Sequence, residues 1–146
     1  MRLTVAWVGK SKDAAISTLT AEYLKRLRRY LTVEGRELGD QAALLKLVCR
    51  PGRTAPILVL LDSRGKQLSS EEFAEFVRGY RDRGSQEMIF VVGPADGWNE
   101  ETRTQANALL SLGKMTYAHE LARVVLAEQL YRAFTILAGH PYHCGH

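Results

Sequence analysis

The chain is short of cysteine and of long apolar runs, and each shortage excludes a class of protein. Its two cysteines, Cys49 and Cys144, could pair only if the tail folded back onto the middle of the chain, so two free thiols in a reducing compartment are the simpler expectation. No apolar run is longer than residues 57–61, far below the roughly 20 residues that a membrane helix needs. The N-terminus also lacks a charged leader followed by an apolar stretch and a cleavage site. We therefore expect a soluble, cytoplasmic protein that makes no membrane contact.

The sequence also lacks a large excess of one sign of charge, because its net charge is only +4. Its distribution is uneven, since residues 1–36 carry eight Lys and Arg against three acidic residues, whereas residues 37–100 carry eight against ten. Any contact with a polyanion should therefore involve the N-terminal element, where four cations cluster: Lys25, Arg26, Arg28 and Arg29. Favourable interaction with a helix dipole and solubility explain this cluster more simply than a contact with an RNA backbone does.

With 46% hydrophobic residues and no internal repeat, the sequence suits one globular domain over residues 1–146. Apolar and β-branched runs predict strands at residues 2–8, 34–38, 57–61, 88–92 and 109–112. Helical spacing of apolar residues predicts helices at residues 13–30, 41–48, 69–84, 99–107 and 120–138. The alternation of strands with helices predicts an α/β layered domain with a mostly parallel sheet.

Three local features sharpen this prediction. The helix at residues 13–30 should direct one apolar face inward, formed by Ile16, Leu19, Tyr23, Leu24 and Leu27. Residues 62–65, Asp-Ser-Arg-Gly, should end the third strand in a turn. The final helix is apolar on more than one side, so a second surface, that of another subunit, should cover the excess.

The turn at residues 93–97, Gly-Pro-Ala-Asp-Gly, lacks the dinucleotide fingerprint, which would need glycines where Ala95 and Trp98 stand. A Rossmann cofactor site is therefore not expected. Ligands of open α/β sheets nevertheless bind beyond the carboxyl ends of the strands. Three such ends are the candidate binding site: Leu61-Asp62, Val92-Gly93 and Leu112-Gly113.

The tail at residues 140–146 gathers three histidines and a cysteine. A structural zinc site uses ligand pairs that a fold holds in place, so we predict no metal site in this terminal segment. Cys144 adjoins His143 with no third group to orient them, which gives no nucleophilic pair. Tyr142 and His143 could donate hydrogen bonds or move a proton near neutral pH, although residue chemistry alone favours a frayed end.

Four segments carry a resemblance to a known family. They are Phe-Val-Val-Gly at 90–93, Leu-Ser-Leu-Gly-Lys-Met-Thr at 110–116, Arg-Val-Val-Leu-Ala-Glu-Gln-Leu-Tyr-Arg-Ala at 123–133 and Pro-Tyr-His at 141–143. Through these segments, and across nearly its whole length, the chain resembles the RlmH family, whose members methylate N3 of a pseudouridine in large-subunit (23S) ribosomal RNA.

The resemblance implies a SPOUT fold, in which an α/β domain has its C-terminal segment threaded into a trefoil knot and two copies form a homodimer. It also implies S-adenosylmethionine as cofactor and ribosomal RNA within the ribosome, not DNA, as partner. The residues that would contact the cofactor are Leu61, Gly93, Leu112, Gly113, Lys114, Met115, Thr116 and Tyr117. The family's tail brings a tyrosine and a histidine to the methyl donor, which makes Tyr142 and His143 the expected catalytic residues.

The chain departs from the family pattern at three places. Pro94 follows Gly93 where the family has a second glycine, Ala118 stands where it has a proline, and residues 144–146 stand where it ends in a basic residue. Two alternatives stay open on the sequence: a SPOUT methyltransferase for another RNA nucleoside, and a non-catalytic dimer that binds RNA or the ribosome.

Overall fold

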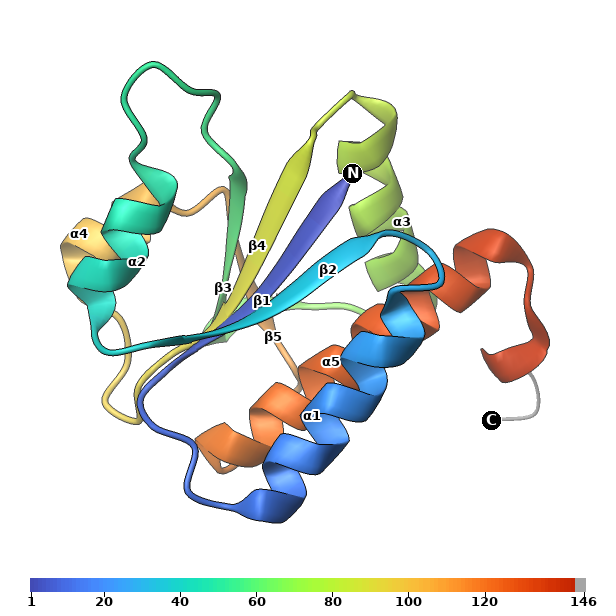
Figure 1. The fold of residues 1–146 in the computed structure, drawn as a ribbon, viewed down its shortest axis with the longest axis horizontal. Coiled ribbons are helices and arrows are strands. Elements are labelled where there is room, and N and C mark those ends of the chain that lie inside the picture. The colour runs from blue at the N-terminus through green and yellow to red at the C-terminus, as the bar shows by residue number, and fades with distance from the viewer. Residues whose placement is uncertain (144–146) are drawn as a thin grey trace.

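The computed structural model describes residues 1–143, apart from the side chain of His143, and shows a parallel sheet covered by helices on both faces (Figure 1). The strands are β1 (Arg2–Val8), β2 (Thr32–Leu38), β3 (Ile57–Gln67), β4 (Glu87–Val92) and β5 (Ala108–Ser111). They pair in the order β2-β1-β4-β3-β5, and every pairing among the described residues is parallel. The predicted α/β domain with a mostly parallel sheet is thus confirmed. The knot stays a prediction.

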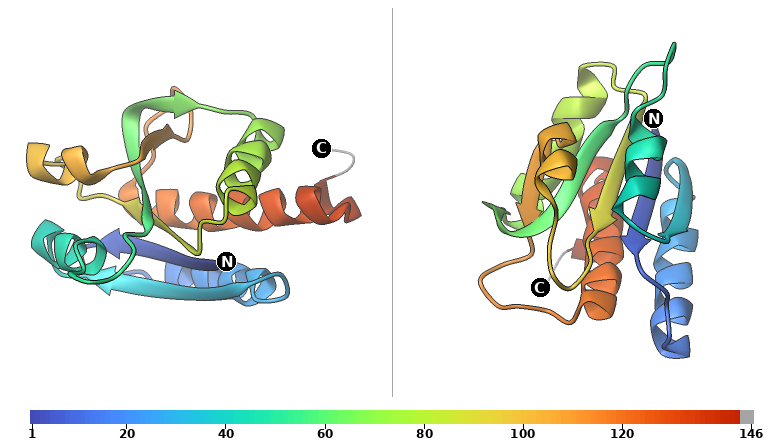
Figure 2. Two further views of the ribbon diagram at one scale, coloured as in Figure 1. Left: turned by 90° about the horizontal axis from the view of Figure 1, so that it is seen from above. Right: turned by 90° about the vertical axis from the view of Figure 1, so that its left-hand side faces the viewer.

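Five α-helices and a terminal 3₁₀ turn connect and follow the strands within residues 1–143. They are α1 (Ala14–Leu27), α2 (Gln41–Val48), α3 (Ser70–Asp82), α4 (Glu100–Gln105), α5 (His119–Ala138) and η1 (Pro141–His143). Helices α1, α3 and α5 lie on one face of the sheet, and α2 and α4 lie on the other (Figure 1). Figure 2 shows α1 and α5 running side by side, and α5 also packs against α3.

Strand β4 shows why the sheet needs both layers. Met88, Phe90 and Val92 belong to the core beneath α1, α3 and α5, whereas Ile89 and Val91 belong to the smaller core beneath α2 and Trp98. Successive side chains of a strand point to opposite faces, so a continuously apolar run requires cover on both. All five of these side chains are buried.

The end of β3 differs from the sequence prediction. Residues 62–65 do not end the strand in a turn, because β3 continues to Gln67 and pairs again with β5 after an irregularity between Leu61 and Lys66. Gly65 permits this continuation, since a Cβ there would lie 2.5 Å from the carbonyl carbon of Leu109. The displaced residues form a bulge that re-aims Asp62 and its neighbours at the end of the sheet.

The ends of two helices and the buried face of α1 also differ from the sequence prediction. Helix α1 ends at Leu27, and α4 covers only residues 100–105 because Asn107 leaves the helix to hydrogen-bond Leu58. Leu19 was predicted to point inward, yet it is 45% exposed on α1. On α5 the excess apolar surface predicted from the sequence is present, since Leu121 is 51% exposed. No helix in the described part of the chain is long and apolar enough to cross a membrane.

Candidate functional site: a cavity at three strand ends

A cavity of about 430 Å³ opens at the carboxyl ends of β4 and β5 and at residues 61–64 of β3, just beyond the part of β3 that pairs with β4. Its wall is formed by residues 61–64, 92–98 and 110–117, with side chains from α4 and α5 closing it. These are the strand ends at which the sequence placed a ligand site. Parallel strands bring their carboxyl ends to one edge of the sheet, and this is why three segments far apart in the chain meet here.

The structure brings all eight predicted cofactor residues into this cavity wall: Leu61, Gly93, Leu112, Gly113, Lys114, Met115, Thr116 and Tyr117. The loop after β5 is the most exposed part of the wall, with Met115 80% and Tyr117 42% exposed. Gly113 turns this loop at a φ of +129°, a conformation that side-chain-bearing residues rarely adopt. The hydroxyl of Ser111 donates a hydrogen bond to the Gly113 carbonyl at 2.8 Å, which holds the turn at the end of β5.

Trp98 holds two of these segments together, a role that no sequence pattern indicated. Its indole Nε1 donates a hydrogen bond to the carbonyl oxygen of Leu61 at 2.8 Å. Its ring also lies directly against Gly93, where an added Cβ would stand 2.7 Å from two ring carbons. Gly93 is therefore required by its packing against Trp98. The ring leaves no space for a side chain at this strand end.

Asp62, which the sequence placed at the candidate site as part of the Leu61-Asp62 strand end, has partners that no sequence pattern indicated. Its side chain is only 5% exposed, and its carboxylate accepts hydrogen bonds from Arg103 Nη2 of α4 and from the backbone N–H of Arg64, both at 2.9 Å. The first bond joins α4 to β3, and the second stabilises the bulge. An almost buried carboxylate needs such partners, because an unpaired buried charge is strongly unfavourable.

Pro94 occupies the place of the second glycine in the turn after β4. It lines the cavity and has no backbone N–H to offer, while its carbonyl accepts a hydrogen bond from the Gly97 N–H at 3.0 Å. Gly97 sits at a φ of +87°. The turn is thus closed by its own backbone, and a ligand there would meet carbonyl and side-chain groups more than backbone donors.

The tail residue Tyr142 lies outside the cavity wall. The hydroxyl of Tyr142 donates to Glu128 Oε2 at 2.8 Å, and the same oxygen pairs with Arg132 Nη2 at 2.8 Å. The Tyr142 ring packs edge-on against Tyr131. Glu128 follows Ala122, the last residue of α5 in the cavity wall, by six positions, which at 1.5 Å per residue is about 9 Å along α5, and Tyr142 does not line the cavity. The structure therefore does not bring Tyr142 to the cavity formed by its own chain.

The chemistry of this tail cluster follows from its contacts. Burial, and then the hydrogen bond to the Glu128 carboxylate, raises the pKa of the Tyr142 phenol. Burial is the largest single effect and acts to lower the pKa of Arg132, but the hydrogen bond to Glu128 and the charges of Glu128 and the nearby tyrosines together outweigh it, so the pKa is raised. Tyr142 thus stays protonated at neutral pH. His143 ends η1, its side chain lies outside the described part of the structure, and so do residues 144–146.

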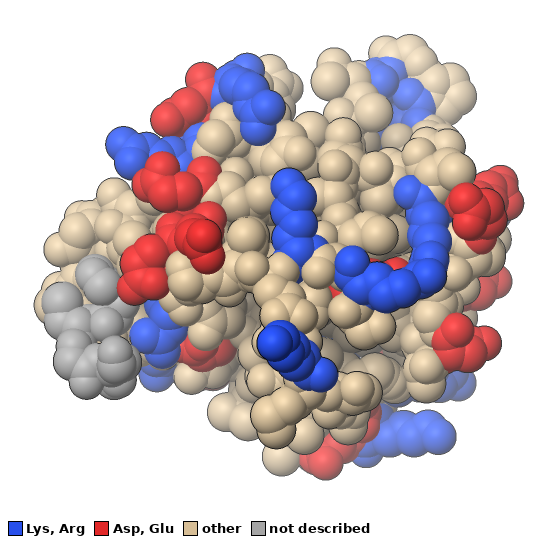
Figure 3. All heavy atoms as spheres, turned by 180° about the vertical axis from the view of Figure 1, so that it is seen from behind, with Lys and Arg blue, Asp and Glu red and all other residues tan. Residues whose placement is uncertain are grey.

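Metal ligands and surface charge add little to the site. Within residues 1–143 no three His, Cys, Asp or Glu side chains come together in a way that could hold a metal ion. On the face turned away in Figure 1, Lys and Arg side chains stand singly across the middle, whereas Asp and Glu gather towards the sides (Figure 3). In the N-terminal cluster Arg26 pairs with Glu22 at 2.8 Å, while Lys25 and Arg29 are exposed at the end of α1.

Comparisons with known proteins show the family of the chain. A family model described as "Predicted SPOUT methyltransferase" matches residues 1–143. A protein of Koribacter versatilis named ribosomal RNA large subunit methyltransferase H is 63% identical over 146 residues, which is the whole of both chains. A protein of the same name from Geotalea daltonii is 41% identical, with 98% of this chain and 99% of the relative covered.

Solved structures show the same fold at much lower identity. A probable methylase family protein from Haemophilus influenzae aligns with a TM-score of 0.57 at 12% identity, covering 94% of this chain and 66% of that one. A structure described as giving insights into 2-OH methylation of C/U34 on tRNA aligns with a TM-score of 0.50 at 17% identity, covering 95% and 98%. At these identities the likeness extends to the fold alone.

Proposed function

Because the chain belongs to the SPOUT methyltransferase family, we propose that it methylates N3 of a pseudouridine in large-subunit ribosomal RNA, using S-adenosylmethionine, on the assembled ribosome. The observation that carries this proposal is the cavity in which three strand ends meet, lined by the same eight residues that the family resemblance had singled out. The two relatives named for large-subunit ribosomal RNA support the substrate class. In this proposal the protein works in the cytoplasm, where ribosomes are, and contacts neither membrane nor DNA.

The cavity suits S-adenosylmethionine in size and in chemistry. Its volume of about 430 Å³ lies within the range of roughly 300–1,000 Å³ that is usual for small-molecule sites. Leu61, Leu112 and Met115 offer apolar contact, and the loop at residues 112–117 offers backbone groups. Bound there, the cofactor would supply an electrophilic methyl group on its sulfonium. The chain itself has to orient the RNA base and exclude water.

Methylation of a ring nitrogen also requires that its proton be removed or displaced. Tyr142 is a poor acceptor for that proton, because its raised pKa keeps the phenol protonated. We therefore assign Tyr142 to positioning of the substrate, with its hydroxyl proton donated to Glu128 and its oxygen left to accept a hydrogen bond. His143 is assigned to proton handling by its residue type, since a histidine titrates near neutral pH.

The distance between tail and cavity leads us to propose a homodimer with composite sites. Glu128 of the tail cluster is about 9 Å along α5 from the nearest cavity-wall residue of that helix, and Tyr142 does not line the cavity of its own chain. The rim of the cavity exposes large apolar side chains, Met115 and Tyr117 from the loop and Leu121 from α5, which suit a subunit interface. A second copy seated there would cover this surface and bring its own Tyr142 towards the cavity.

The decisive experiment is a methyl-transfer assay on ribosomes from a strain that lacks the enzyme, followed by mapping of the methylated nucleoside. We expect label at N3 of a large-subunit pseudouridine with the wild-type protein, and none with a Tyr142→Ala, His143→Ala double variant. Label at another nucleoside would favour a different RNA target. No binding of millimolar S-adenosylmethionine in calorimetry would favour a non-catalytic binding dimer instead.

A further inference from the structure

Arg123 is a buried guanidinium that neither the cavity nor the tail explains. It lies in the first part of α5 with only 2% of its side chain exposed, and it is the bulkiest of the fully buried side chains described. Its guanidinium lies 4.3 Å from the ring centroid of Trp7, and its Nη2 donates to the hydroxyl of Ser11 at 2.8 Å. Burying a charge is unfavourable unless it is paired and hydrogen-bonded, so its presence calls for a structural purpose.

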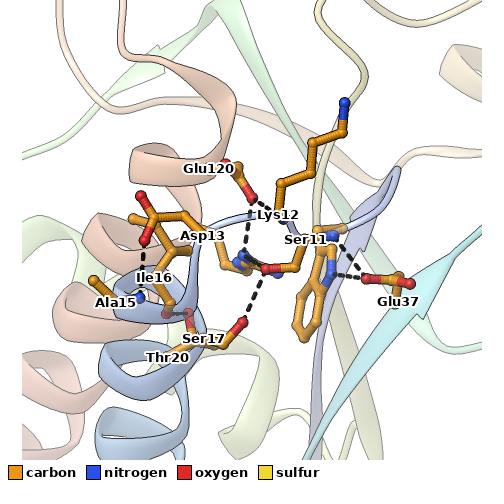
Figure 4. A network of polar contacts seen from close by, with 11 residues as sticks. Ser11, Lys12, Asp13, Ala15, Ile16, Ser17, Thr20, Glu37 and Glu120 are labelled. Carbon is orange, nitrogen blue, oxygen red and sulfur yellow. Dashed lines mark hydrogen bonds and ion pairs between the residues drawn. The ribbon is translucent and has the colours of Figure 1, made fainter.

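Two carboxylates, Glu37 and Glu120, hold the segment between β1 and α1 beside Arg123 (Figure 4). We call the group of Trp7, Ser11, Glu37, Glu120 and Arg123 the hub. Glu37 of β2 accepts the Ser11 backbone N–H at 3.0 Å and the indole N–H of Trp7 at 3.4 Å. Glu120 of α5 accepts the Lys12 backbone N–H at 2.9 Å and lies 3.8 Å from Arg123 Nη2. The hub therefore fastens the start of α5 to the loop after β1 and, through it, to β2.

The start of α5 needs such a fastening because it has no cap of its own. Ala118 occupies the N-cap position, and no side chain there accepts a hydrogen bond from the first turn. Helices α1, α2, α3 and α4 all begin with a capping Asp, Ser or Asn. An uncapped end frays readily, since its first backbone N–H groups have no intrahelical partner.

The hub is also adjacent to the cavity. His119, the first residue of α5, lines both the main cavity and the small void beside Arg123. Ala122, next to Arg123 in sequence, lines the main cavity as well. The loop at residues 112–118 runs directly into this first turn, so any movement of the turn moves the loop.

We propose that Arg123 is a positioning residue: it holds the first turn of α5, and with it the loop at residues 112–118, in the arrangement that binds the cofactor. This inference rests on the proposed function for the meaning of the cavity. It goes beyond that function by assigning a role to a residue that touches neither cofactor nor substrate. The conformation of the loop itself can be tested without any ligand.

The test compares Arg123→Met with Arg50→Met. Arg50 is a matched control because it is also largely buried and paired, with Glu87 at 2.9 Å, but it lies at the opposite end of the sheet from the cavity. Amide hydrogen exchange of the free proteins is measured at residues 112–122, together with the Kd for S-adenosylmethionine and the thermal midpoint. We expect Arg123→Met to speed exchange at residues 112–122 at least tenfold and to raise the Kd at least tenfold. Arg50→Met should lower the midpoint and leave both quantities unchanged.

Two milder variants keep the test decisive if Arg123→Met fails to fold. Arg123→Lys retains the charge without the planar fork and should give an intermediate effect, and Glu37→Gln should loosen the loop through Ser11 and Trp7 while Arg123 stays in place. Unchanged exchange at residues 112–122 in both variants, or equal effects of the Arg123 and Arg50 substitutions, would overturn the inference. A wild-type protein that binds no S-adenosylmethionine would count against the proposed function only, because the exchange data would still decide the role of Arg123.

Discussion

The packing of Gly93 against Trp98 makes Gly93→Ala an informative perturbation. The new Cβ would stand 2.7 Å from Cε2 and Cζ2 of the indole, closer than carbon atoms approach in folded proteins. The ring cannot swing away freely, because it is only 8% exposed and its Nε1 is bonded to the Leu61 carbonyl. Overpacking of this kind costs about 1–3 kcal/mol of unfolding free energy. The same shift would displace the strand end that lines the cavity, so the affinity for S-adenosylmethionine should fall as well.

A double-mutant cycle isolates the steric cause. Trp98→Leu alone should destabilise by about 3–4 kcal/mol, through the cavity it leaves and the lost hydrogen bond. In the Gly93→Ala, Trp98→Leu double variant the clash is gone, so its total cost should fall short of the sum by about 1–2 kcal/mol. Urea titrations with linear extrapolation measure these differences.

Gly39→Ala is the control for this cycle, because a Cβ at Gly39 meets nothing within 4 Å. It should change stability by less than about 0.5 kcal/mol, as surface substitutions usually do. Additive costs in the cycle, or a Gly93→Ala variant as stable as the Gly39→Ala control, would refute the steric reasoning.

Three further predictions concern the tail, the cavity wall and pH. If the tail acts across a dimer, inactive Tyr142→Ala and Gly93→Ala chains co-assembled in equal amounts should regain about a quarter of the wild-type activity. Half of the dimers are then mixed, and each mixed dimer has one site with an intact cavity and an intact tail. A site formed by a single chain would regain no activity. Asp62→Asn leaves its guanidinium partners uncompensated and should lower stability by about 1–3 kcal/mol in thermal unfolding, whereas Asp82→Asn, whose side chain is 61% exposed, should have little effect. A backbone hydrogen bond and then the Trp7 indole lower the pKa of Glu37, so its contribution is fully present above the ordinary glutamate pKa of about 4.3 and is lost as the pH falls through the lower folded value. Glu37→Gln should therefore lose less stability than the wild type between about pH 5 and pH 3, and parallel acid-unfolding curves would contradict this.

Much of the local structure could be predicted because it depends on neighbours in the chain. A capping box of Ser69 and Glu72 starts α3 within the predicted helix at residues 69–84, and α2 spans its predicted residues. The continuous apolar run at residues 88–92 correctly predicted the strand β4. The failure at the end of β3 had a tertiary cause: the turn-like Asp-Ser-Arg-Gly segment became an irregularity within the strand, because β5 lies close enough at Gly65 to pair with the residues beyond it.

The strand ends that form the cavity were thus determined by the sequence itself, through apolar runs that stop at glycines and through the segments that resemble the family. Only the tertiary structure decided what holds those ends in place. Trp98 reaches Leu61 across 37 positions, Arg103 reaches Asp62 across 41, and Arg123 reaches Ser11 across 112. Apolar periodicity tells which face of an element is buried, but not which element lies beside it. The order β2-β1-β4-β3-β5 supplies that information, and with it the partners of each buried polar group.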